Sequence, residues 1–205
     1  MTYLMRKLTL LCSAGTLCAG ILAFSGCAKY QPQPLGMPKA LSEEKNEIEV
    51  TAQALTESEC RKTFSRRILN KGYQPIQLVI KNKSKHTYIL DAANIELQIE
   101  PAHLVAKRLH LNTAGRAISW AAGGLFLWPL YIPAVVEGCQ SSSANKRLSR
   151  DITHRTISDD ARIFIYPGST INKVLFVTDE NYRHKFNLHL FSKETDELVT
   201  FEIRI

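Results

Sequence analysis

The sequence predicts a mainly β protein, an antiparallel β-sandwich with two or three helices and an apolar helical insert. Short runs in which apolar and polar side chains alternate are typical of strands that bury one face. Turn residues separate these runs at the close intervals of an all-β domain. Apolar residues make up 45% of the 205 residues and charged residues 22%, so the chain can build a hydrophobic core and is not a disordered polymer.

The first predicted helix begins after Thr56. Thr56 and Glu59 have the spacing of a capping box, in which each side chain bonds a free backbone amide of the first turn. Gly72 is the residue type that commonly ends a helix, so the helix is expected to run to that point. Apolar side chains recur every fourth position and mark the buried face, at Cys60, Phe64 and Ile68.

Two further helices are predicted in the middle of the chain. Pro101 stands where a short helix begins, since its fixed φ angle suits the first turn, and an apolar stripe follows at Leu104, Val105 and Leu109. The second is predicted over Ala144–Arg155. Its apolar face would consist of Ala144, Leu148 and Ile152, with Lys146, Arg147, Arg150 and Asp151 on the polar side.

The predicted strands lie before, between and after these helices. Pro75 introduces the first strand, and the turn Pro167–Gly168 separates two strands of the C-terminal part. With one face apolar and one polar, strands of this length suggest the two packed sheets of a sandwich. The runs cover residues 76–81, 87–90, 95–100, 163–165, 171–177, 186–190 and 199–205.

The N-terminal residues 1–26 have the pattern of a secretory signal peptide. Two basic residues are followed by an uncharged apolar stretch and then by small residues, as a signal peptidase requires. The sequence Phe24-Ser25-Gly26-Cys27 resembles the lipobox of bacterial lipoproteins, from which only Phe24 departs, since Leu is usual there. The alternative is an uncleaved signal anchor, for which the apolar stretch is nearly long enough.

The lipobox resemblance implies that the chain is cleaved before Cys27 and that Cys27 carries diacylglycerol and a further acyl chain. Two or three acyl chains form a lasting membrane anchor, whereas one binds reversibly. Ala28 follows the cysteine in place of the Asp that signals inner-membrane retention, so the expected location is the outer membrane of the bacterial envelope. Cleavage removes Arg6 and Lys7 and lowers the net charge from +7 to +5.

The mature chain is expected to consist of a lipidated flexible tether, residues 27–47, and one sandwich domain, residues 48–205. The tether region contains several prolines and glutamines and shows no apolar periodicity. About 20 flexible residues span roughly 25 Å on average, enough to lift the domain off the bilayer.

The arrangement resembles a loose group of uncharacterised bacterial lipoproteins with an immunoglobulin-like domain. The shared features are Gly72–Tyr73 after a helix, Pro75 before an apolar strand that ends at Asn82, Ala144–Asn145 at a helix, and Pro167–Gly168 before a strand with Val174, Leu175 and Phe176. The resemblance implies an immunoglobulin-like fold for most of residues 50–205. It carries no activity.

A basic patch is predicted on the first helix, at Arg61, Lys62, Arg66 and Arg67. These residues open a stretch, 61–85, that holds eight basic residues and no acid. For an exported lipoprotein the expected partner is an anionic lipid or an acidic envelope component rather than nucleic acid. A solvated charged surface without a partner is the alternative interpretation.

Two cysteines remain in the mature chain beside Cys27. Cys60 and Cys139 are candidates for a disulfide, because two cysteines in an oxidising compartment commonly pair. Two separate buried thiols are the alternative, since the sequence does not show the distance between them. A redox motif is not expected, because the spacing Cys-x-x-Cys is absent.

Residues 117–136 form an uncharged apolar insert about as long as a transmembrane helix. Pro129 and Pro133 argue against one continuous helix and favour a broken helical hairpin. The hairpin would either pack on the sandwich or contact the membrane or a partner through Trp128, Leu130 and Tyr131.

The sequence favours a binding or structural role over catalysis. It contains no Gly-x-Ser-x-Gly elbow, no His-Glu-x-x-His motif and no phosphate-binding glycine loop, and its six histidines are scattered. No cofactor and no metal site are therefore expected. Two alternatives stay open: a membrane-inserting component of an envelope assembly or transport machine, acting through residues 117–136, and a hydrolase with an unrecognised site.

Overall fold

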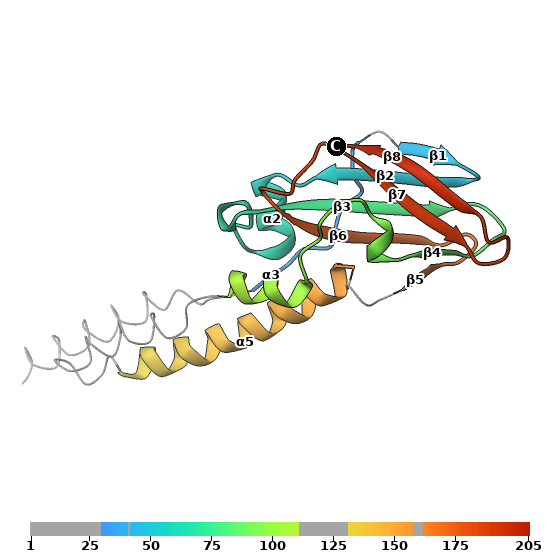
Figure 1. Cartoon of the computed structure of the whole chain (residues 1–205). Helices are drawn as coiled ribbons and strands as arrows, with labels where there is room; N and C mark the ends of the chain where they lie inside the picture. The colour runs from blue at the N-terminus through green and yellow to red at the C-terminus, as the bar shows by residue number, and fades with distance from the viewer. Residues whose placement is uncertain (1–29, 41, 111–130, 158–161) are drawn as a thin grey trace, which may run out of the picture. The chain divides into compact units, whose positions relative to one another are not determined.

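The computed structural model describes residues 30–40, 42–110, 131–157 and 162–205 (Figure 1). Contacts divide the chain into two units, residues 1–29 with 111–144 and residues 30–110 with 145–205. Of the first unit the structure describes residues 131–144, which are helical. The second unit is the β domain.

Two four-stranded antiparallel sheets form the β domain (Figure 1). Sheet A has the order β1-β2-β3-β6 and sheet B the order β5-β4-β7-β8. The predicted mainly β, sandwich-like class with additional helices is therefore confirmed. The strands are β1 (Ser42–Lys45), β2 (Ile48–Ala54), β3 (Tyr73–Asn82), β4 (Tyr88–Leu90), β5 (Ile163–Ile165), β6 (Thr170–Thr178), β7 (Lys185–Ser192) and β8 (Leu198–Arg204).

Three α-helices accompany the sheets within the described residues: α2 (Glu57–Phe64), α3 (Ala102–Leu109) and α5 (Tyr131–Arg155). The predicted start of α3 after Pro101 is confirmed. Helix α5 contains the predicted helix 144–155 and begins earlier than expected, at Tyr131. Pro133 lies in its first turn, where the missing amide hydrogen of a proline breaks no helical hydrogen bond.

Helix α2 begins as predicted and ends earlier than predicted. The capping box is present: the backbone amide of Thr56 donates to Glu59 at 2.8 Å, and the Glu59 amide donates to the Thr56 hydroxyl at 3.4 Å. Ser65 then adopts a left-handed conformation with φ 52°, which stops the helix at Phe64. Gly72 ends a separate 3-10 turn, Leu69–Lys71, with φ 78°.

The last part of the predicted tether, residues 27–47, is a strand in the structure. Ser42–Lys45 is the edge strand β1, which pairs with β2 through a two-residue turn. Asn46 and Glu47 adopt φ angles of 51° and 60° in this turn, as a tight hairpin with the twist of a sheet requires. Strand β1 is mostly exposed and carries no large apolar residue, which is why its sequence shows no strand periodicity.

The predicted strand 95–100 is a crossing segment rather than a strand. Ile95 forms a single bridge to Leu188 of sheet B, and Ile99 forms a single bridge to Val177 of sheet A. The alternation of apolar residues here reflects burial of Ile95 and Leu97 where the chain passes from one sheet to the other. Apolar and polar residues therefore alternate in this segment although it forms no continuous hydrogen-bonded ladder with a neighbouring strand.

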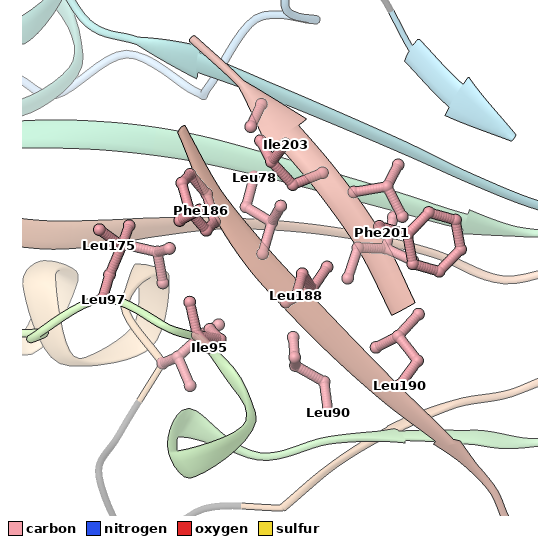
Figure 2. Packing of buried hydrophobic residues seen from close by; sticks show 14 of the residues in the cluster. Leu78, Leu90, Ile95, Leu97, Leu175, Phe186, Leu188, Leu190, Phe201 and Ile203 are labelled. Carbon is pink, nitrogen blue, oxygen red and sulfur yellow. The ribbon is translucent and has the colours of Figure 1, made fainter. Parts of the chain in front are cut away.

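The inward faces of the two sheets form one hydrophobic core (Figure 2). Leu78 and Leu175 from sheet A face Leu188, Leu190 and Phe201 from sheet B, and the picture shows these side chains pointing toward one another. Phe201 is completely buried. The period-two pattern of the C-terminal strands is thus explained, since their alternate residues face this core, namely Phe186, Leu188 and Leu190 on β7 and Val199, Phe201 and Ile203 on β8.

Candidate functional site

Residues 30–36, here called the N-terminal segment, are bound to the domain. Tyr30 is 7% exposed, and its hydroxyl donates a 2.5 Å hydrogen bond to Oδ2 of Asp151 on α5. The backbone amide of Gln33 donates to the carbonyl oxygen of Lys62 at 3.0 Å. Nη1 of Arg155 donates to the carbonyl oxygen of Gln33 at 2.7 Å, so that α2 and α5 both hold the segment.

The far end of the N-terminal segment lies on the outer face of sheet A. Nε2 of Gln77, a buried residue of the central strand β3, donates to the carbonyl oxygen of Gly36 at 2.6 Å. The same Nε2 donates to Oδ1 of Asn172 on β6 at 2.9 Å. Strand β3 is therefore covered on both faces in its middle part, which explains why residues 75–80 are all buried rather than alternately buried as their sequence suggested.

An open hollow of about 300 Å³ lies between the N-terminal segment and α5. Tyr30 and Pro32 form one wall. Arg147, Arg150, Asp151 and His154 form the other. Their spacing of three or four residues places them on one exposed face of α5, while Leu148 and Ile152 point into the domain and are completely buried.

The hollow carries a strong excess of positive charge. Both oxygens of Asp151 are already engaged, Oδ2 by the hydroxyl of Tyr30 and Oδ1 by Nε of Arg155 at 2.8 Å. Burial and the neighbouring carboxylate raise the pKa of Tyr30, so this hydroxyl stays a donor. Among the described residues Arg147 and Arg150 form no ion pair, so their guanidinium groups face the hollow without a carboxylate partner.

Arg66 adds a further positive charge beside Tyr30. Its guanidinium lies 5.6 Å from the centre of the Tyr30 ring, a cation–π contact. Nη1 donates to the carbonyl oxygen of Ser65 at 2.8 Å, whereas Nε and Nη2 are buried without a hydrogen-bond partner. Burial accordingly lowers the pKa of Arg66. Burial lowers the pKa of His110 as well, and the positive charge of Arg66 lowers it further. Nε2 of His110 lies 2.8 Å from the hydroxyl of Ser149.

The four residues of the predicted basic patch have different environments. Arg61 and Lys62 are exposed, and Arg61 forms an ion pair with Glu57 at 3.5 Å. Arg67 is exposed, and Arg66 is folded under Tyr30. Arg66 contacts the ring of Tyr30, and the hollow is lined instead by Arg147 and Arg150, two residues that sequence analysis recognised only as the polar side of a helix. Periodicity showed that they are exposed but gave no sign of Tyr30 opposite them.

Cys60 is a free thiol in the structure, and the predicted disulfide to Cys139 stays a prediction because the side chain of Cys139 is not described. The side chain of Cys60 is completely buried on the inner face of α2. Burial, followed by the charges of Glu57 and Glu59, raises the pKa of the thiol to about 12, as expected for an unreactive structural cysteine. The side chain of Cys139 and the whole of Cys27 lie outside the described residues.

The apolar insert 117–136 also lies largely outside the described residues. This holds for Trp128 and Leu130, while Tyr131 is the first residue of α5 and its side chain is not described. Within the described ranges, no helix is long and apolar enough to span a membrane.

The outer face of sheet B carries a row of four apolar side chains, one from each strand. Phe164 on β5 pairs with Ile89 on β4, Ile89 with Phe191 on β7, and Phe191 with Leu198 on β8. Phe164 and Leu198 are 41% and 55% exposed. Beside this row, Nδ1 of His189 lies 2.9 Å from the hydroxyl of Thr200.

Neither the arrangement of metal-binding side chains nor the comparison with known proteins points to an enzyme family. In the part of the chain that the structure describes, no group of three or more His, Cys, Asp or Glu residues is arranged to hold a metal ion. No protein-family model, no curated protein and no solved structure matches the chain.

Proposed function

We propose that the protein is an envelope lipoprotein, anchored through acylated Cys27, whose β domain has a non-catalytic binding role at the membrane surface. The observation that carries this proposal is the position of Tyr30. It is bonded to Asp151 at 2.5 Å and lies three residues after the lipobox cysteine. An anchor at Cys27 would therefore be attached almost directly to the domain.

Chain length limits how far the domain can lie from such an anchor. The three peptide links from Cys27 to Tyr30 span at most about 11 Å when fully extended. The predicted 20-residue tether would instead have allowed about 25 Å on average and any orientation. With a short connection, the surface around Tyr30 lies at the level of the lipid headgroups.

The strand connections support the immunoglobulin-like assignment. In that fold strands A, B, E and D form one sheet and C, F and G form the other, with C′ beside C in the variable type. The order β2-β3-β6 in sheet A is the order expected for A, B and E, and β1 does not correspond to D because it lies beside β2. The order β5-β4-β7-β8 in sheet B is the order expected for C′, C, F and G.

The chemistry of the hollow favours binding over catalysis. A hydrolase of the serine or cysteine type needs a nucleophile beside a base. No serine, threonine or cysteine lines the hollow, and the carboxylate of Asp151 is held by Tyr30 and Arg155 rather than by His154. What remains available is a set of guanidinium groups, which bind anions.

Intact-mass spectrometry of the membrane fraction tests the anchor. We expect a mass that begins at Cys27 and includes acyl chains. A Cys27→Ala variant should lose the acyl mass and remain uncleaved. Cys18→Ala, in the same signal region, is the matched control and should keep both. A full-length, unacylated wild-type mass would overturn the proposal.

A further inference from the structure

We infer that the hollow formed by Tyr30, Pro32 and the exposed face of α5 binds the phosphate group of an anionic phospholipid headgroup. This inference rests on the proposed membrane anchor, because it takes the lipid surface as the source of the phosphate. It goes beyond the anchor, since it assigns a defined site to residues that have no part in acylation.

The first support is the set of donors. Arg147 and Arg150 lie three positions apart on one face of α5 and line the same hollow. A guanidinium group donates two parallel hydrogen bonds to a phosphate, so two neighbouring arginines provide four such donors. His154 lines the same wall and can supply one more ring N–H.

The second support is that the charge of Asp151 does not cancel these donors. Its two oxygens accept hydrogen bonds from Tyr30 and from Arg155, so the carboxylate is turned toward them. Arg66 adds a cation beside the ring of Tyr30. Two unpaired arginines therefore line the hollow, and its one aspartate is paired with Arg155, so its net charge attracts an anion.

The third support is the location of the hollow relative to the lipobox. Tyr30 is both a wall of the hollow and the residue three positions after Cys27. An acylated Cys27 would hold the backbone of Tyr30 within about 11 Å of the lipidated residue. Phosphates of neighbouring lipids lie at that level, so the anchor would raise their concentration at the hollow. It would not raise the concentration of a soluble phosphate compound.

Native mass spectrometry of the acylated full chain in dodecyl maltoside micelles tests the site. The probes are phosphatidylglycerol, which is anionic, and phosphatidylcholine, which has the same acyl chains and no net charge. We expect one phosphatidylglycerol to be retained per chain. The double variant Arg147→Gln, Arg150→Gln should weaken its retention roughly thirty-fold, on the basis of the usual contribution of each basic residue at an anionic lipid surface.

A matched control separates a site from general charge. Lys81 and Lys85 are exposed and lie at the end of β3 remote from α2, so the variant Lys81→Gln, Lys85→Gln removes two cations away from the hollow. It should retain phosphatidylglycerol as the wild type does. Circular dichroism of both variants should show unchanged melting, because the four side chains are exposed.

The inference is overturned if the wild type retains the two lipids equally, or if both double variants lose phosphatidylglycerol to the same extent. It is also overturned if free glycerol phosphate in solution binds the hollow and displaces the lipid. The mass of the same sample reports acylation of Cys27 independently. If the hollow does not bind phosphatidylglycerol although Cys27 is acylated, the inference is wrong and the proposed anchor is unaffected. A missing acyl mass contradicts the anchor itself.

Discussion

The hydroxyl of Tyr30 bonds Oδ2 of Asp151 at 2.5 Å, although the two residues lie 121 positions apart in the sequence. This contact joins the beginning of the described chain to the last turns of α5. It creates one wall of the hollow. The N-terminal segment is thus part of the domain rather than a spacer.

Replacing Tyr30 by Phe removes this hydrogen bond and keeps the ring that Arg66 stacks on. We expect the free energy of unfolding in urea to fall by about 1.5 kcal/mol, the usual contribution of a hydrogen bond to a charged acceptor. Hydrogen exchange at the Gln33 amide should accelerate, because the segment is held less firmly. Tyr166→Phe is the matched control: Tyr166 is 61% exposed, and its loss of a hydroxyl should leave both measurements unchanged. Equal effects of the two variants would contradict the role given to Tyr30.

Sequence patterns predicted the elements whose signals are local. The capping box of Thr56 and Glu59, the buried stripe of Leu148 and Ile152, and the alternating C-terminal strands depend on neighbours a few residues away. Strand β1 was missed because its partner, not its own composition, makes it a strand. The same holds for Tyr30, whose burial depends on Asp151 and Arg66, and for Ile95 and Ile99, whose partners lie on different sheets.

The candidate site was predicted only in part for the same reason. The basic character of the region after Thr56 was evident, yet Arg66 is stacked on Tyr30 and Arg61 is paired with Glu57. The arginines that remain available, Arg147 and Arg150, come from a helix far along the chain. Only the packing of α5 against the N-terminal segment brings them to the same place.

Phe201 and Phe164 should differ sharply when each is replaced by Ala. Phe201 is completely buried between the sheets, so its removal leaves a cavity and should cost about 3–5 kcal/mol of unfolding free energy. Phe164 is 41% exposed on the outer face of sheet B, and its loss should cost about 1 kcal/mol or less. Urea denaturation followed by far-ultraviolet circular dichroism measures both. A similar cost for the two variants would show that Phe164 is not a surface residue.

Cys60 should resist alkylation while the protein is folded. Its thiol is buried and its pKa is raised to about 12, so almost no thiolate exists at pH 8. Iodoacetamide is expected to leave the peptide that contains Cys60 unmodified in native buffer and to label it completely in urea, without a reducing agent. A non-reduced peptide map in which Cys60 is joined to Cys139 would contradict the free thiol.

Glu202 should titrate well below other glutamates. Hydrogen bonds from Lys185 and from Arg204 lower its pKa from the ordinary 4.5 to about 2. Because the pKa is lowered in the folded state, the ionised carboxylate stabilises the fold above pH 4.5, and this contribution is lost as the pH falls from about 4.5 to about 2. Carbon-13 NMR of the side-chain carboxyl groups measures the titration.

The variant Lys185→Met should raise the pKa of Glu202 only part of the way toward 4.5, since Arg204 remains 2.7 Å from the carboxylate. The control is Lys193→Met. Lys193 lies over the ring of Phe164, so its replacement should not change the pKa of Glu202. A wild-type pKa near 4.5, or the same response to both variants, would refute the assigned cause.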